Sequence, residues 1–441
     1  MKIVVSILLL AAVTLGSKAQ DSTAWTLEKC ITYAYENNLD LKRQQLNVQY
    51  SETQLQQNKY SLLPSLNANS TYNVGFGRTL DQSDYSYHNS TTQSVNAGIN
   101  SSVSLFEGFA KQNSIKKSKA DYSASLVDVD KSKNDIALQL ANQYLQILYG
   151  KEMLAVAQEQ YRQTEQTVLR MEKLVQAGSK PIGSLLEMKS QLSKDAVTVI
   201  QAENNLNIAT LEMVQMLDLE STSNFSVEIP QLPELLPGLL TPPDEVYNTA
   251  VENMPEIKGS QFRLESSNYQ LSAAKGAVYP TLTLNGGWGT QVAYYEGKQA
   301  ISFQDEFSNN SNSYVGLSLN IPIFNGHRTT TNIRNAKYSV QDAQYKLSQQ
   351  KLTLRKEIQQ ASNEAIGAYK KYLASQDALE ASKESFKYTQ KRFDVEMLNA
   401  VDYNLAKTNL LKAESDLLQS KYEYIFKTKI LDFYKGLKIS L

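Results

Sequence analysis

Two halves of this 441-residue chain present the same sequence features in the same order, and this internal duplication constrains the fold more than any other property. Pro280 follows Pro64 by 216 positions, and residues 249–258 follow their counterparts at residues 33–42 by the same interval. A repeat of this length exceeds the roughly 20 to 50 residues of solenoid units. We therefore predict a unit that has been doubled within one subunit.

The first twenty residues match a secretory signal peptide. Lys2 precedes an apolar run at residues 3–15, and small residues follow at the positions that a signal peptidase reads. We expect residues 1–20 to be removed from the mature chain. No later stretch reaches the roughly 18 to 20 consecutive apolar residues of a membrane-spanning helix, so we expect the mature chain to leave the cytoplasm without a helical anchor.

The charged and reactive side chains favour a protein that is not an enzyme. The formal net charge is -1, which argues against nucleic acid as a partner. His88 and His327 are the only histidines, and no cluster of His, Cys and carboxylates has metal-ligand spacing. The single cysteine, Cys30, excludes an intrachain disulfide. We expect no cofactor, no metal site and no catalytic residue.

Four segments alternate apolar and polar residues with the period of a β-strand. They are residues 65–76, 95–105, 281–292 and 314–323. Each would present one apolar face and one face made mainly of Asn, Ser, Thr and Gly. A half-buried strand of a soluble sandwich has the same pattern. The segment lengths, however, approach the roughly 9 to 11 residues of a tilted membrane-crossing strand, and the polar faces carry no Lys, Arg, Asp or Glu.

These strands indicate a barrel that several subunits share. The strands of each pair are separated by polar segments, residues 77–94 and 293–313, which we expect to form long loops. The 26 tyrosines suit surfaces that are dry on one side and wet on the other. Small single-chain membrane barrels begin at about eight strands, so four strands cannot close one. More than one copy of the chain must contribute.

Most of the remaining chain is predicted to form long coiled-coil helices. Residues 110–177 contain no proline and one glycine, Gly150, which predicts a rod of roughly 100 Å. Interruptions at residues 178–181 and near Asn399 predict two antiparallel hairpins, whose apolar stripes are packing seams that recur every seven residues. The series are Leu140, Ile147, Leu154, Tyr161, Val168, Val175; Leu185, Leu192, Val199, Leu206, Met213; Ile358, Ala365, Tyr372, Leu379, Phe386, Phe393; and Leu411, Leu418, Ile425.

The domain organisation follows from these elements. Residues 21–218 are predicted to form a first repeat of a helix, a strand pair and a long helical hairpin. Residues 243–441 are predicted to form a second repeat of the same design. Between them, residues 219–242 are rich in proline and lack periodicity, which indicates a linker.

Taken together, these features resemble the TolC-like outer-membrane efflux proteins, or outer membrane factors. The resemblance runs from Trp25 to about Gly436. Its most telling local matches are two helix-to-strand passages, residues 63–66 and 279–282, and two strand-to-helix corners, residues 105–108 and 323–326. Each motif is short, but their order and duplicated spacing make a chance match improbable.

The resemblance implies a mixed fold, mainly α with β. Three subunits would form a homotrimer with an α-helical barrel of long hairpins and a shared twelve-stranded transmembrane β-barrel. It implies the outer membrane of a Gram-negative bacterium, with a large periplasmic part and outer-membrane lipid around the barrel. The expected partners are a periplasmic adaptor (membrane fusion) protein and an inner-membrane pump. The implied function is the exit duct of a tripartite efflux or type I secretion system, whose substrate the residues do not specify.

Asp402 is the candidate periplasmic gate that the resemblance implies, because residues 401–406 resemble the segment that carries aspartate rings in this family. Leu405 stands where the best-known members have a second aspartate, and Gly183 stands at the matching place of the first half. An ordinary helix N-cap is the alternative interpretation of Asp402. If three such carboxylates met on one axis, their repulsion would raise the apparent pKa values and favour a bound cation.

The hairpin tips are the candidate surface for docking an adaptor. The candidate residues are Gly178, Ser179 and Pro181 in the first hairpin and Leu398, Asn399, Ala400 and Val401 in the second. Small residues at these positions also let a turn close, and the two roles are compatible.

Three other functional classes compete with the duct. A passive porin fits poorly with four strands per chain and long helices. A periplasmic or surface coiled-coil structural protein, without transport, is the main alternative. A secreted hydrolase lacks a convergent nucleophile and base. Scattered carboxylates such as Glu187 and Asp195 are expected on solvated helix faces or in surface ion pairs.

Overall fold

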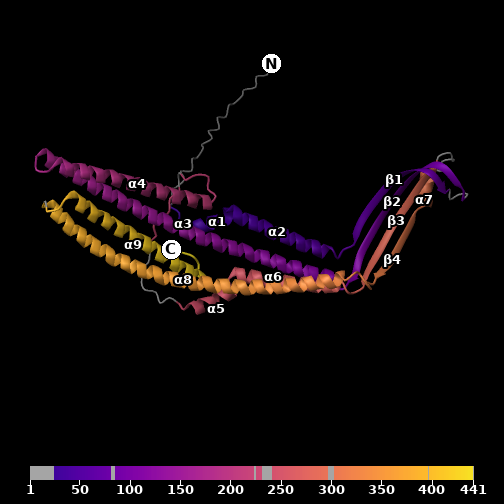
Figure 1. The fold of residues 1–441 in the computed structure, drawn as a ribbon. Coiled ribbons are helices and arrows are strands. Elements are labelled where there is room, and N and C mark those ends of the chain that lie inside the picture. Colours follow the sequence, from indigo (N-terminus) through magenta and orange to yellow (C-terminus); the bar gives the residue numbers. More distant parts are fainter. Residues whose placement is uncertain are drawn as a thin grey trace, which may run out of the picture.

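The computed structural model describes residues 24–80, 85–222, 225–230, 241–295, 302–395 and 397–440. Within these ranges the molecule is an elongated bundle of helices with a four-stranded antiparallel sheet at one end (Figure 1). The predicted signal peptide and much of the predicted linker lie outside the described residues.

The order of two helices, two strands, a long helix and a shorter helix occurs twice along the chain. The first set is α1 (Leu27–Asn37), α2 (Leu39–Tyr60), β1 (Ser65–Leu80), β2 (Tyr87–Glu107), α3 (Ala110–Gln176) and α4 (Ile182–Met216). The second is α5 (Pro243–Asn253), α6 (Pro255–Gly276), β3 (Thr281–Tyr295), β4 (Asn312–Asn320), α8 (Arg328–Asp394) and α9 (Ala400–Tyr434), with a short helix, α7 (Phe303–Asn309), between its strands.

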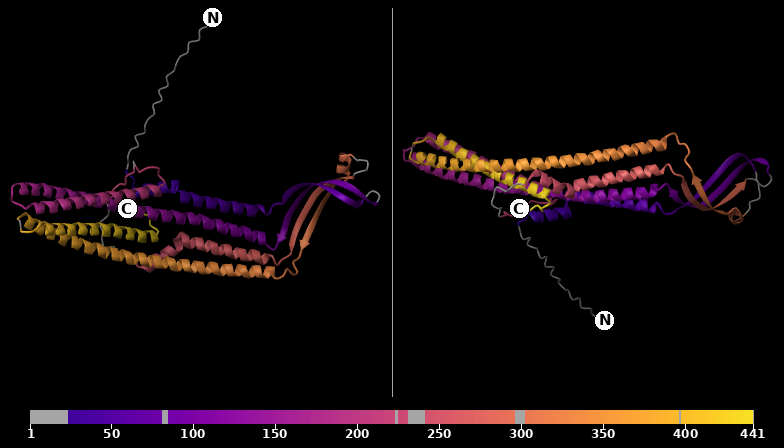
Figure 2. Two further views of the ribbon diagram at one scale, coloured as in Figure 1. Left: turned by 45° about the horizontal axis from the view of Figure 1, so that its top comes forward. Right: turned by 90° about the horizontal axis from the view of Figure 1, so that it is seen from below.

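The long helices agree with the seven-residue pattern. The helices α3 and α8 have 67 residues each, and α4 and α9 have 35 each. In both hairpins the shorter helix folds back antiparallel along the longer one (Figure 2). Leu140, Ile147 and Val168 of the predicted stripe are buried, which confirms that the stripe is a packing seam.

Three of the strands, β1, β2 and β3, are longer than predicted, and the segments between paired strands are correspondingly shorter. β1 and β2 pair without interruption from Ser65 with Ser102 to Leu80 with Tyr87, so most of the expected loop at residues 77–94 is strand. The expected loop at residues 293–313 contains the end of β3 and the helix α7. β4 ends at Asn320, before the predicted residue 323, and Pro322 cannot donate a backbone hydrogen bond to continue the ladder.

The register places the apolar residues of all four strands on one face of the sheet. Ala68 pairs with Ile99, and Ile99 pairs with Trp288. Nearer the helices, Leu284 pairs with both Val103 and Leu317. Much of this face is open within the subunit: Phe76 is 82% exposed and Val315 is 83% exposed.

Both strand-to-helix corners use a left-handed glycine. Gly108 has φ +58° before α3, and Gly326 has φ +61° before α8. The residues that follow, Phe109 and His327, are also left-handed. An ideal Cβ at Gly108 would lie 2.2 Å from the backbone oxygen of Gly276, whereas one at Gly326 would meet nothing within 4 Å. The first corner is therefore packed tightly against the end of α6, and the second is open within the subunit.

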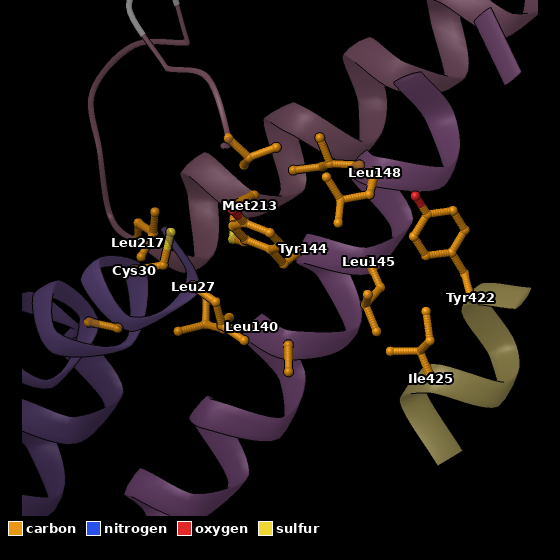
Figure 3. Close-up of a cluster of buried hydrophobic side chains, with 14 residues drawn as sticks. Leu27, Cys30, Leu140, Tyr144, Leu145, Leu148, Met213, Leu217, Tyr422 and Ile425 are labelled. Carbon is orange, nitrogen blue, oxygen red and sulfur yellow. The ribbon is translucent and has the colours of Figure 1, made fainter. Parts of the chain in front are cut away.

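The main hydrophobic core lies midway along the molecule, where α1, α3, α4 and α9 meet (Figure 3). Tyr144 lies at its centre, and its single O–H is shared between the backbone oxygens of Trp25, at 3.0 Å, and Glu228, at 2.6 Å. Cys30 is fully buried here, and burial raises the pKa of its thiol to about 12. This core packs α1 and the end of α4, which begin and end the first half of the chain, against α3 and α9.

Candidate functional site at the hairpin tips

The first hairpin tip is closed by a compact helix-ending motif. Gly178 has φ +73°, and its N–H donates to the oxygen of Val175 at 3.0 Å. The N–H and the side chain of Ser179 both donate to the oxygen of Leu174, each at 2.9 Å. These bonds satisfy carbonyl groups that a helix end would leave unpaired. Pro181 is the N-cap residue of α4, and Gly178, Ser179 and Pro181 are all exposed.

The second tip begins α9 with a side-chain cap. Asn399 is the N-cap, and its side-chain oxygen accepts the N–H of Asp402 at 2.8 Å. Val401 is 59% exposed and Leu398 is half-buried. Ala400 is only 2% exposed because it packs into the core between the hairpins. Ala400 therefore supports the tip from within, while Val401 and Asn399 offer surface.

Asp402 is the third residue of α9 and is exposed. The alternative interpretation of Asp402 as an N-cap is wrong, because Asn399 occupies that position. An acidic side chain in the first turn interacts favourably with the helix dipole. Among the described residues, no side-chain hydrogen bond or ion pair engages its carboxylate. Leu405, one turn further on, is 60% exposed.

Gly183 lies at the corresponding start of α4. It is the second residue of that helix and is exposed, with open space around the position of a Cβ. The two tips of one subunit thus offer a single carboxylate at this level.

A hydrophobic cluster holds the two tips of one subunit together. Its aromatic part comes from the second hairpin, where the rings of Phe393 and Tyr403 stack with centroids 4.5 Å apart and Phe386 lies 5.5 Å from Tyr403. Met171 and Met188 pack against it from the first hairpin. Burial raises the pKa of the Tyr403 hydroxyl.

An ion pair and a groove lie beside this cluster. The Arg170 guanidinium lies 2.7 Å from the Asp394 carboxylate and joins α3 to the end of α8, but both side chains are well exposed, so its contribution to stability is small. The adjoining groove, of about 940 Å³, is lined by polar and charged side chains together with Phe386 and Phe393.

A buried ion pair lies a few turns behind the tips. Lys407 of α9 lies 3.0 Å from the carboxylate of Asp195 of α4, and these side chains are only 4% and 9% exposed. Lys407 also donates to the backbone oxygen of Gln160, at 2.9 Å, and to the hydroxyl of Thr164. Thr164 in turn donates to Asp195. Burial lowers the pKa of Lys407, and the Asp195 carboxylate opposes that effect.

This network corrects the prediction that Asp195 is solvated. The helix α9 packs against α3 and α4 where Asp195 lies, and that contact joins residues far apart in the sequence. A signal was present: Thr164 and Asp195 lie three positions after Tyr161 and Leu192 of the seven-residue series, at the second core position of a heptad. Lys407 holds the same position in the series that contains Leu411. Glu187, by contrast, is exposed as predicted.

Metal and membrane-helix features were sought in the same described ranges. No group of three or more His, Cys, Asp or Glu side chains there is arranged to hold a metal ion. No helix in that part of the chain combines the length and apolar character needed to cross a membrane.

Comparison with known families decides which class of protein has this architecture. The family model for outer membrane efflux proteins matches residues 30–218 and 246–429, which together make up most of the chain. The chain belongs to the outer membrane efflux protein family. This membership confirms the predicted family and the outer-membrane location, and it favours an efflux protein over the coiled-coil protein without transport.

Curated relatives are distant but extensive. The outer membrane efflux protein BepC of Brucella suis is 20% identical over 428 residues, which cover 96% of this chain and 88% of BepC. The outer membrane protein TolC of Escherichia coli is 22% identical over 66% of this chain, and the match spans 59% of TolC. The cation efflux system protein CusC of Escherichia coli is 23% identical over 78% of this chain and 73% of its own length.

Solved structures share the fold over nearly the whole chain. The Campylobacter jejuni CmeC outer membrane channel superposes with a TM-score of 0.79 at 20% identity, covering 94% of this chain and 87% of CmeC. A membrane protein of Pseudomonas aeruginosa gives 0.79 at 18% identity, covering 94% and 90% of the two chains. These likenesses confirm the predicted mixed fold of long helical hairpins and a β-sheet.

Proposed function

We propose that this efflux protein is the exit duct of a tripartite efflux or type I secretion system and that it works as a homotrimer. Three subunits would join their sheets into a twelve-stranded barrel in the outer membrane and their hairpins into a tunnel through the periplasm. An inner-membrane pump and a periplasmic adaptor would supply the substrate.

The observation that carries this proposal is the sheet with two open edges. The strand order is β1-β2-β3-β4, so β1 and β4 each have one edge without a strand partner among the described residues. Open edges of this length template pairing with another chain. One face of the sheet is apolar across all four strands, as lipid contact requires. A barrel closed by further copies of the chain would pair both open edges and would turn the apolar face toward lipid.

We also propose that residues 21–218 and 243–441 are two structural repeats joined by the linker at residues 219–242. Three subunits would then contribute six similar units around one pore. The repeated order of elements and the two matched ranges of the family model support this division.

The hairpin tips are proposed to carry the gate and the docking surface. Asp402 is exposed and its carboxylate is unengaged in the described part of the subunit, as a residue that meets its symmetry copies requires. Gly178, Ser179, Pro181, Asn399 and Val401 form the exposed tips that an adaptor would contact. Ala400 holds the second tip in place from beneath, and the half-buried Leu398 completes the candidate docking surface.

Ion conductance of the purified protein in planar lipid bilayers tests the duct. The trimer fraction of a detergent extract should insert and produce discrete current steps. A monomer fraction from the same extract should produce none, because four strands cannot enclose a pore.

A further inference from the structure

The edge of β3 has two different neighbours along its length. Nearer the helices, residues 281–289 pair with β4, whose last partner on this side is Asn312, opposite Gly289. Beyond Gly289, β3 continues to Tyr295 and stays paired with β2 on its other edge. No strand in the described chain pairs with residues 290–295 on the β4 side. The helix α7 lies there instead (Figure 1).

The helix α7 and the residue after it engage polar groups of β3 beyond β4. The N–H of Ala293 donates to the Glu306 carboxylate at 2.9 Å, and the Asn310 amide donates to the oxygen of Gln291 at 2.9 Å. The Thr290 hydroxyl donates to the oxygen of Phe307 at 2.7 Å. Backbone groups on this edge of β3 are thereby hydrogen-bonded by α7 and Asn310 in place of a neighbouring strand, and these bonds hold α7 against β3.

The two outer strands of the sheet differ in length in a way that leaves a slot for this helix. β1 has 16 residues and β4 has 9, so at least seven residues of β1 lack a β4 partner when the two edges join. Both strands meet the helices at one end, β1 at Ser65 and β4 at Asn320. If these two ends lie level in the joined edges, the unpaired part of β1 is its far end, residues 74–80. Strands lie about 4.8 Å apart, so a missing strand leaves its two neighbours about 10 Å apart between their axes and vacates the width of one strand. A helix is about 10 Å wide, so α7 would cover this gap by standing out from the plane of the sheet.

We propose that α7 is an intersubunit wedge, which fills this slot between β3 of its own subunit and the far end of β1 in a second copy of the chain. The inference rests on the proposed trimer and goes beyond it, because it assigns a specific contact that replaces strand pairing. The wedge completes the barrel wall where the strand ladder between subunits stops.

Exposed apolar side chains support a second copy as the occupant. The ring of Phe307 packs 5.8 Å from Trp288, and by the strand register Trp288 and Phe76 lie on the same face of the sheet. Phe303, stacked on Phe307, remains 59% exposed, and Phe76 is 82% exposed. The wedge would cover both exposed rings.

The charges on the two surfaces are complementary. Asp305 and Glu306 are the charged residues of α7, and Glu306 is already engaged with β3. Arg78 is the charged residue of β1 and lies in the far end that faces the slot. Asp305 and Arg78 are both exposed within the subunit. An Arg78 side chain from the next subunit would find Asp305 free to pair.

Cysteine crosslinking between differently tagged subunits tests the wedge. Phe303→Cys in one copy and Phe76→Cys in the other should form a disulfide-linked pair in outer membranes treated with a mild oxidant. The control pairs Phe303→Cys with Leu66→Cys, which is 74% exposed on the same strand face but about 33 Å from residue 76 at roughly 3.3 Å per residue. The native Cys30 is fully buried and will not compete.

The outcomes separate the wedge from the trimer. A crosslink for the Phe76 pair and none for the Leu66 pair supports the wedge. An intact trimer with no Phe76 crosslink overturns the wedge and leaves the proposed duct standing. Labelling of the Phe303→Cys variant by a lipid-soluble thiol probe would then identify lipid as what covers α7. Absence of any trimer overturns both the wedge and the duct.

Charge reversal provides a second test of the wedge. Arg78→Asp should lower the temperature at which the trimer dissociates on a gel, and adding Asp305→Arg should restore that temperature. No restoration counts against a contact between Arg78 and Asp305.

Discussion

At the scale of single residues, the Lys407 and Asp195 pair is the most unusual feature of the subunit. A buried ion pair is a weak source of stability compared with apolar residues of the same shape, because both charges lose water. Removing one partner is much more costly, because the other charge stays buried and unpaired. The hydrogen bonds from Thr164 and Gln191 to Asp195 do not replace a missing cation.

Replacement of Lys407 by methionine should therefore destabilise the hairpins. We expect Lys407→Met to lower the free energy of unfolding by about 3 to 5 kcal/mol, measured by guanidinium denaturation followed by circular dichroism. The double variant Lys407→Met with Asp195→Leu should recover most of that loss. The matched control is Lys427→Met, which breaks a more exposed pair with Glu364 and should cost under about 1 kcal/mol. Equal stability of Lys407→Met and the wild type would contradict this account of the pair.

Asp402 is the residue on which the proposed gate depends. If three Asp402 carboxylates meet near the axis, they will bind divalent cations, and Asp402→Asn should weaken the block of single-channel current by added divalent ions. Asp416→Asn is the control, because Asp416 is a second aspartate of the same helix, about 21 Å further from the tip. An unchanged block in Asp402→Asn would remove the gate assignment, as would an equal effect of both variants.

At the scale of elements, the sequence predicted the long hairpins well and the sheet only in part. Seven-residue periodicity from Leu140 to Val175 in α3 and from Ile358 to Phe393 in α8 is a strong signal, because the apolar position recurs over several consecutive heptads. The far half of β2 is rich in Ser, Thr, Asn and Gln, so it lacks alternation and looks like a loop. The helix α7 is too short to show any period.

The corner glycines offer a matched pair for testing how the sheet joins the helices. Gly326→Ala should cost about 1 to 2 kcal/mol, from the left-handed backbone alone. Gly108→Ala should cost about 1 to 3 kcal/mol more, because its Cβ would overlap the oxygen of Gly276 and the end of α6 must move. Both are measured as loss of folded protein in guanidinium. If the two variants lost the same stability, α6 would not be packed against this corner.

At the scale of the whole molecule, the sequence indicates the class of protein, while the contacts between its halves have to come from the structure. Strand length, neutral polar faces and duplication already pointed to a shared barrel. The heptad position of Asp195 indicated a core site, but its pairing with Lys407 could not be anticipated in the same way, because it depends on α9 packing against α4 across 212 positions of sequence. The N-cap role of Asn399 illustrates the same limit, since Asn399 and Asp402 are both preferred capping residues and only the helix start distinguishes them.

The subunit is also incomplete by itself. Its sheet has two open edges, an apolar face without cover and a helix, α7, that bonds β3 on one side only. These features lie at the end of the molecule furthest from the hairpin tips (Figure 1). A duct made from several copies accounts for all of them together.

The most direct test of this account is the conductance of size-separated protein in planar lipid bilayers. The detergent extract is divided into trimer and monomer fractions, and equal amounts of chain are added to the bilayer. We predict discrete, uniform current steps from the trimer fraction and none from the monomer fraction. Steps of the same size from monomers, or a stable trimer that never conducts in any variant of the hairpin tips, would contradict the claim that three subunits form one duct.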